Sequence, residues 1–152
     1  MSDPAITAAK KAIVSTLHSD ATILGEFGSE HILYGEPRNV DLRTVARQIN
    51  VMSYGIVHEA YAVLSARQSN VTYQFWILVS FMETEPIAAS DRWEVYDSMV
   101  KNALDGNPTL GGTANLGIRF TESRVLNHPE IDPLYHVLIG VEAKHRIAAG
   151  GR

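Results

Sequence analysis

The sequence lacks cysteine altogether, which excludes disulfide bonds and thiolate metal sites and is compatible with a reducing compartment. It also lacks any apolar run near the ~20 residues that a membrane-spanning helix requires. Its first residues, MSDPAITAAKK, begin with an acidic side chain and reach their lysines late, which is the reverse of a secretory signal peptide. We therefore expect a soluble intracellular protein with no membrane partner.

A large excess of one charge is missing as well. The chain has 13 basic and 17 acidic residues, a formal net charge of -4, and the two signs are mixed along the sequence. Proteins that bind nucleic acid gather lysine and arginine into a basic patch that meets the phosphates. No specific nucleic-acid binding is expected.

The motifs of several common enzyme classes are also absent. The sequence has no G-x-S-x-G elbow, no H-E-x-x-H zinc motif and no P-loop. The glycine-rich TLGGTANLG follows a predicted helix and leads into a predicted strand, the wrong order for a phosphate cradle. His136 and His145 differ by an odd number, so on one regular strand they point to opposite faces and cannot share a metal. We predict no catalytic residue, no cofactor and no metal site.

What is present fits one domain, because 152 residues can bury a sizeable core. We assign residues 1–146 to a single domain and 147–152, rich in glycine, to a flexible tail. Asp3 as N-cap and Pro4 in the first helical position predict a helix that ends near residues 18–20. Its apolar residues recur at helical spacing: Ile6, Ala9, Ile13, Val14 and Leu17.

The next part of the chain is harder to interpret. Residues 22–41 are rich in glycine and predict a loop with one short strand over 31–34. The pattern of residues 40–66 is mixed, and we predict strands over 48–53 and 58–65. A polar loop over 67–70 then leads to a strong strand over 71–82, which would complete a long β-hairpin.

The strand over 71–82 is apolar at every odd position, which predicts a continuous core face. Its even face carries Trp76, Leu78 and Met82 and is more apolar than a solvated face requires, so a second layer or a partner should cover it. Two interpretations of Trp76 remain open: an interface hot spot, or a side chain buried under the 22–41 loop.

Asp91 followed by Glu94 predicts a capping box that opens a helix ending at Asp105, with Gly106 as a left-handed C-cap. The same acidic residues could form a general acid and base pair, but capping is the simpler interpretation. A turn at Gly111 and Gly112 leads to a strand over 116–121, whose alternation falters after Glu122 and indicates a bulge or the end of pairing. The last strand turns residues 135, 137, 139, 141 and 143 toward the core.

Two arginines, Arg119 and Arg124, are predicted on the outward side of the strand that follows this turn. Such residues usually form a solvated face, but across a subunit seam they could meet Glu83, Glu85 or Asp97. The clustered strands with segregated helices predict an α+β fold: a mostly antiparallel sheet, two main helices packed on it and a long β-hairpin.

This order of elements resembles the tail terminator, or tail completion, proteins of long-tailed bacteriophages. The resemblance rests on DPAITAAKKAIVSTL, ILYGEPR, a hairpin ending in FWILVSFME, a helix, NPTLGG and a closing pair ending in YHVLIGVEAKHR. Its most recognisable local piece is LDGNPTLGGTANLGIRF, followed by a loop that contains Asp132. No diagnostic motif transfers a functional residue.

The resemblance implies a structural virion protein made in the host cytoplasm, located at the head-proximal end of the tail. It implies a hexameric ring that stops polymerisation of the tail tube protein and joins the tail to a neck or head-completion protein. A closed ring needs two different patches on each subunit. Our candidate interface residues are Arg67, at the tip of the hairpin, with Trp76, Leu78, Met82, Arg119 and Arg124.

Other interpretations remain. Another neck protein, a head-closure or stopper protein, would also form a ring. A small α+β enzyme or ligand-binding domain would instead have a pocket between the sheet and the 22–41 loop, with ionisable residues of perturbed pKa. A ferredoxin-like regulatory domain would assemble as two or four copies.

Overall fold

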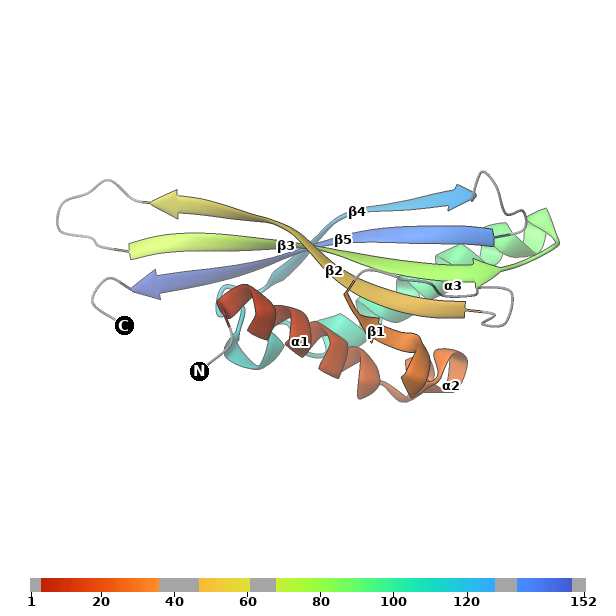
Figure 1. Ribbon diagram of the computed structural model, residues 1–152, viewed down its shortest axis with the longest axis horizontal. Helices are drawn as coiled ribbons and strands as arrows, with labels where there is room; N and C mark the ends of the chain where they lie inside the picture. Colours follow the sequence, from red (N-terminus) through yellow and green to blue (C-terminus); the bar gives the residue numbers. More distant parts are fainter. Residues whose placement is uncertain (1–3, 36–46, 61–67, 128–133, 149–152) are drawn as a thin grey trace.

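A computed structural model describes residues 4–35, 47–60, 68–127 and 134–148 of the chain. The fold is α+β, as the sequence predicted (Figure 1). The elements in chain order are α1 (Ala5–His18), α2 (Ala21–Phe27), the 3₁₀ turn η1 (Ser29–His31), β1 (Ile32–Tyr34), β2 (Arg47–Ala60), β3 (Gln68–Met82), α3 (Pro86–Asp105), the 3₁₀ turn η2 (Leu110–Gly112), β4 (Ile118–Asn127) and β5 (Leu134–Ala148). None of the helices in these described ranges is long and apolar enough to cross a membrane.

The five strands form one sheet in the order β1-β2-β3-β5-β4. Only β1 runs parallel to its neighbour, and the other three pairings are antiparallel. The predicted long hairpin is confirmed, because β2 pairs with β3 from Arg47↔Phe81 to Ala60↔Ser69. The separate strands predicted over 48–53 and 58–65 are wrong, because β2 is continuous and crosses residues 53–55 through a bulge, which keeps the pairing while adding one residue. Residues 61–65 lie outside the described ranges.

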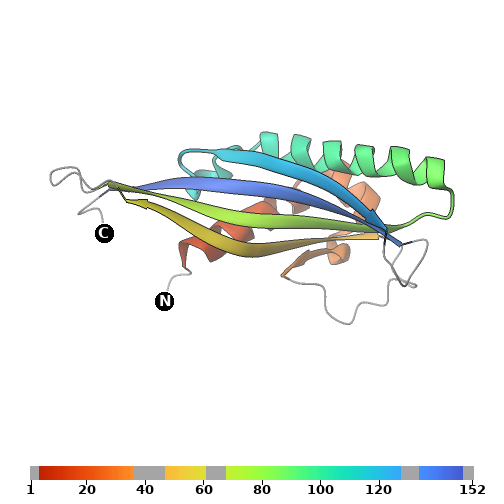
Figure 2. The ribbon, with the colours of Figure 1, turned by 90° about the horizontal axis from the view of Figure 1, so that it is seen from above.

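All three α-helices contribute to the same core on one face of the sheet. The odd residues of β3 from Val71 to Phe81 are buried there, as predicted. On β5, Val137, Ile139, Val141 and Ala143 are buried, and Tyr135 packs partly buried against the core. Figure 2 shows α3 lying along the sheet. The buried helical residues of this core are Ala9, Ile13, Leu17, Ile23, Phe27, Ala89, Tyr96, Val100, Ala103 and Leu104.

The predicted end of α3 at Asp105 is confirmed, but its predicted start and the left-handed conformation predicted for Gly106 are wrong. The helix begins at Pro86, whose fixed φ and missing N–H suit the first turn, so Asp91 lies inside the helix and caps nothing. Gly106 follows the helix with φ of -71°, which is right-handed. The positive φ values belong to Gly111 and Gly112, at +67° and +94°, so the chain reverses in this turn.

The N-terminal helices differ from expectation in a similar way. Pro4 occupies the N-cap position of α1, outside the first turn, and makes no side-chain cap; Asp3 lies outside the described residues. The short strand β1 is confirmed at Ile32–Tyr34. The sequence prediction missed α2, whose N-cap is Asp20; the Asp20 carboxylate accepts a hydrogen bond from the Ile23 N–H at 3.0 Å.

Three strands continue past the N-terminal end of α1 and form one end of the molecule (Figure 1). We call their outer parts, residues 56–60, 68–72 and 144–148, the strand extension. Val57 pairs with Thr72, and Thr72 pairs with Lys144, so the three strands stay in register there. Since β5 runs through Ala148, residues 147 and 148 of the predicted tail belong to the strand, and 149–152 lie outside the described part.

Candidate functional site

The even residues of β3 face away from the helices, on the side of the sheet that we call the helix-free face. Trp76 is flanked there by Met52 of β2 and Gly140 of β5. Leu78 lies between Asn50 and Leu138, and Met82 pairs with Leu134 at the end of the strand. The side chains of Trp76, Leu78 and Met82 are all partly buried. The structure therefore brings these three predicted interface residues onto one strand face.

Trp76 is held by two neighbours. Its indole stacks on the ring of Tyr54, with centroids 5.0 Å apart and an interplanar angle of 25°. Tyr54 follows Met52 on this face and is the residue that the β2 bulge leaves without a partner in the register. Gly140 leaves room on the other side of the indole: a Cβ there would approach Trp76 Cζ3 to 3.2 Å. Burial, and then the charges of Glu142 and Glu122, raise the pKa of Tyr54. The aromatic pair is preorganised, and 45% of Tyr54 remains exposed.

The structure bears on the prediction that the 22–41 segment could bury Trp76. Ile23, Phe27 and Ile32 belong to the core on the helix side, and β1 pairs with β2 at the edge of the sheet. These buried residues lie on the helix side of the sheet and do not cover Trp76, whereas the Gly35 carbonyl accepts a hydrogen bond from the Asn50 side chain beside Leu78 at 3.2 Å. Residues 36–41 are outside the described ranges.

Arg119 and Arg124 both lie on the helix-free face, because a second bulge between Phe120 and Glu122 shifts the alternation of β4. The sequence indicated this irregularity at nearly the right place. Arg119 forms an ion pair with Glu142, and Arg124 bonds to Glu122 with Nε 2.7 Å from the carboxylate. The arginine side chains are 66% and 65% exposed, so these surface pairs contribute little to folding stability.

Two of the three acidic residues predicted to meet these arginines, Glu83 and Asp97, have other partners within the chain. Glu83 pairs with Arg92 at 3.2 Å, and Asp97 pairs with Lys101 at 2.9 Å. Asp97 also accepts a hydrogen bond from Ser123 of β4 at 2.5 Å. The remaining predicted residue, Arg67, lies outside the described residues.

An ionic network that the sequence analysis missed joins α2, α3 and β2. The buried Tyr96 hydroxyl donates to Glu26 at 2.9 Å and accepts from Arg47 at 3.1 Å and Arg92 at 3.3 Å. Arg47 also pairs with Glu26, and the hydrogen bond to Tyr96 is the main cause that raises the pKa of Arg92. These residues lie far apart in the chain, so no local spacing signals them. Beside the network lies a groove of about 370 Å³ between α2 and α3.

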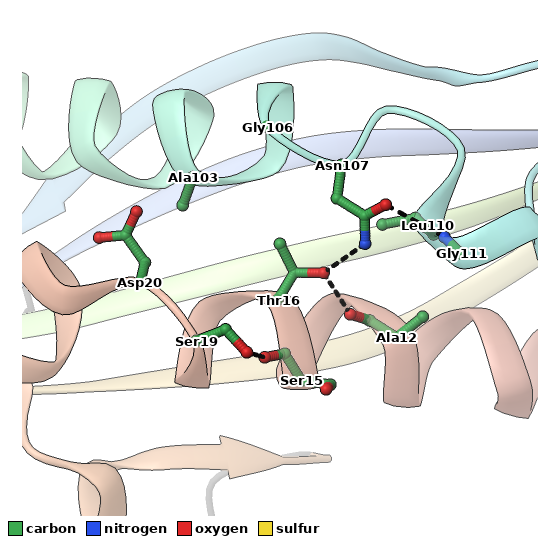
Figure 3. A pocket seen from close by; sticks show the side chains of 10 residues that line it. All are labelled: Ala12, Ser15, Thr16, Ser19, Asp20, Ala103, Gly106, Asn107, Leu110 and Gly111. Atoms are coloured by element: carbon green, nitrogen blue, oxygen red, sulfur yellow. Dashed lines mark hydrogen bonds between the residues drawn. The ribbon is translucent and has the colours of Figure 1, made fainter.

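A polar pocket of about 420 Å³ lies between the second half of α1 and the turn after α3 (Figure 3). Its polar groups bond to one another: Asn107 donates to Thr16 at 3.0 Å and accepts from the Gly111 N–H at 3.1 Å. Asp20 is the one ionisable residue in its lining, and its carboxylate caps α2. The pocket is not between the sheet and the 22–41 loop, where an enzyme or ligand-binding domain was expected to have it.

The histidines do not converge either. His136 lies on the helix-free face within 2.8 Å of Ser80 Oγ, whereas His145 pairs opposite Val71 on the helix side. The predicted placement on opposite faces of β5 is confirmed. Across the described ranges, no three histidine, aspartate or glutamate side chains come together as a metal site would require.

Comparisons with known proteins indicate the architecture. No protein-family profile matches the chain, and no curated protein matches it. Among solved structures it is similar to a chain of the structure titled "Virion of native gene transfer agent (GTA) particle", with a TM-score of 0.53 and 12% sequence identity. The similarity covers 94% of this chain and 98% of that one. At this identity it shows a shared fold.

Proposed function

We propose that this chain is a structural protein of a phage-like virion, and specifically a tail terminator. Six copies form a ring that caps the tail tube, stops polymerisation of the tube protein and joins the tail to the neck at its head-proximal end. The observation that carries the proposal is the fold shared with a chain of a gene transfer agent virion, over 94% of this chain and 98% of that one. The likeness therefore extends over the whole of a subunit that is built into such a particle.

The surfaces of the chain support a role in assembly. The helix-free face presents Tyr54, Trp76 and Leu78 in one partly exposed group, and aromatic side chains often anchor interfaces. The charges beside this group, on Arg119 and Arg124, sit in exposed ion pairs that a neighbouring subunit can re-pair at little cost. We propose that the helix-free face is one seam of the ring. The subunit is the single domain, which includes all of β5, without catalytic function or cofactor.

The mass of the purified protein tests the ring, measured by light scattering behind a sizing column at several concentrations. We expect a hexamer, seen as a ring by negative-stain microscopy, either alone or after addition of the tube protein from the same particle. A terminator should also shorten the tubes that this tube protein forms. Protein that stays monomeric with and without tubes, and leaves their length unchanged, contradicts the proposal.

The same experiment separates the alternative roles. A head-closure or stopper protein would form rings but leave tube polymerisation unchanged, because it binds on the portal side of the neck. An enzyme or ligand-binding domain would show no ring and would bind a small molecule in a pocket. The polar pocket of Figure 3 offers few groups for this, because its amide, hydroxyl and carboxylate side chains are engaged with one another and with the backbone.

A further inference from the structure

We propose that the strand extension of one copy binds the outer face of α3 and the adjoining α2–α3 groove of a second copy. This seam rests on the proposed ring and names the two surfaces that would close it. It is distinct from the group around Trp76, since it joins the two ends of the molecule.

The outer face of α3 combines apolar and acidic side chains. Ile87, Asp91, Glu94 and Val95 fall within about 100° of one another around a helix of 3.6 residues per turn, and all four are exposed. Ile87 is 83% exposed and Val95 54%, the two highest values among the exposed large hydrophobic residues of the described chain. Neither Asp91 nor Glu94 has an ion pair with another described residue. This face of α3 thus has the composition of an interface, and its acidic residues have no ion-pair partner within the described ranges.

The α2–α3 groove continues this face. Val95 and Asp91 belong to its lining together with Ala88, Met99 and Glu26. Its apolar lining suits a branched or flexible apolar side chain, and Asp91 gives it a negative charge, whereas Glu26 is paired with Arg47. Arg92, also in the lining, is held by Tyr96 and Glu83 within the chain.

The strand extension has the complementary composition. Val57 is 43% exposed, and its register with Thr72 and Lys144 places it on the same side of the sheet as that lysine. Ile56, which is 46% exposed, pairs with Tyr73 and points to the other side; Leu116, beside the extension, bonds through its N–H to the carbonyl of Lys144 and is 43% exposed. Lys144 and Arg146 follow on β5 and have no ion pair with any described residue; Arg146 contacts the amide oxygen of Asn70 at 3.5 Å. The other described lysines and arginines already interact with groups of the chain.

The two surfaces lie at opposite ends of one subunit and cannot meet within it. Figures 1 and 2 both show the strand extension at one end, with α2 and the start of α3 toward the other. A contact between two different surfaces is heterologous, and such contacts build closed rings when the rotation between copies closes. The apolar groups and the opposite charges therefore fit a second copy of the chain as the occupant of the groove. The charges also fix the orientation of the seam.

Charge reversal across the seam tests this assignment. We expect D91K/E94K to lose ring assembly, and K144E/R146E to lose it as well, each with unchanged circular dichroism. An equimolar mixture of the two variants should recover the ring, because each reversed surface then meets a surface of opposite charge. The matched control is D105K, which reverses an exposed carboxylate at the far end of α3 and should assemble as the wild type does.

Cross-linking gives an independent readout, since the chain has no cysteine of its own. V57C mixed with V95C should form a covalent dimer with a flexible bis-maleimide, whereas V57C mixed with D105C, an exposed position at the far end of α3, should not. Rings that form in both charge variants, or a mixture that fails to recover assembly, would overturn the seam while leaving the ring intact. A wild-type protein that never assembles would contradict the ring itself. Wild-type dimers in which each copy binds the other through both surfaces would contradict the ring and indicate a closed dimer instead.

Discussion

Gly140 is a residue whose smallness is required by its surroundings. A Cβ at this position would collide with the hydroxyl of Thr121 and would come within 3.2 Å of the Trp76 indole. We expect Gly140→Ala to lower the free energy of unfolding by about 1–3 kcal/mol, as overpacking does. Chemical denaturation of the purified variant measures this change.

The control for this prediction is Gly25→Ala. Its Cβ meets no atom within 4 Å, and alanine in a helix is favoured over glycine by about 0.5–1 kcal/mol, so this variant should be as stable as the wild type or more so. Adding Thr121→Ala to Gly140→Ala should restore part of the loss. A Gly140→Ala protein with wild-type stability would show that the indole and Thr121 shift freely.

The Tyr96 hydroxyl is the centre of the ionic network between α2, α3 and β2. It has three partners, Glu26, Arg47 and Arg92, and the tyrosine is only 2% exposed. Tyr96→Phe leaves a carboxylate and two guanidinium groups short of a partner, and we expect a loss of about 1–3 kcal/mol in unfolding free energy.

Tyr34→Phe is the matched change for Tyr96→Phe. Tyr34 is 45% exposed, and Lys10 lies 4.4 Å from its ring centroid, a contact that phenylalanine keeps. Equal stability of the two variants in thermal and denaturant unfolding would mean that water replaces the Tyr96 hydroxyl without cost.

At the scale of the elements, α2 depends on its cap and on its burial. A helix of seven residues is marginal by itself in water, and its first turn is held by the Asp20 carboxylate. Asp20→Ala should cost about 1 kcal/mol and speed amide exchange in residues 21–27. Asp105→Ala, which removes an exposed carboxylate that caps no helix, should change neither. Unchanged exchange in α2 after Asp20→Ala would show that packing alone holds the helix.

The burial of α2 also explains why the sequence analysis took this region for a loop. Gly25 and Gly28 lower the helix propensity of this segment. Ile23 and Phe27 are nevertheless buried, and the ring centroids of Phe27 and Tyr96 lie 5.0 Å apart. Packing against α3 overrides the local preference. The predicted start of α3 was wrong because Asp91 and Glu94 have the spacing of a capping box although they lie inside the helix, which begins at Pro86.

At the scale of the whole molecule, the group around Trp76 should matter for assembly more than for folding. We expect Trp76→Ala and Leu78→Asp to weaken ring formation while the subunit stays folded, because one side of both residues is open to solvent. Trp76→Ala should cost about 1–2 kcal/mol of stability, less than for a fully buried tryptophan. Sizing with light scattering and circular dichroism together separate the two effects.

Tyr34→Ala serves as the control for these variants, since it removes an exposed aromatic side chain from β1, at the edge of the sheet. It should leave assembly unchanged. Unfolded Trp76→Ala and Leu78→Asp proteins would place these residues in the core, and folded variants that still form rings would remove the helix-free face from the interface. The predicted roles of Arg119 and Arg124 in a seam remain predictions, since the structure shows both arginines paired within one chain.

Periodicity by itself determined the parts of this protein in which side chains alternate between water and core. The helical stripe of α1, the two faces of β3, the inner face of β5 and the α+β class all follow from spacing along the chain, because burial repeats with the local geometry. The tertiary structure alone decided the strand order, the stacking of Tyr54 on Trp76, the space that Gly140 leaves and the network around Tyr96. Each of these depends on contacts between residues distant in sequence, for which local spacing carries no signal.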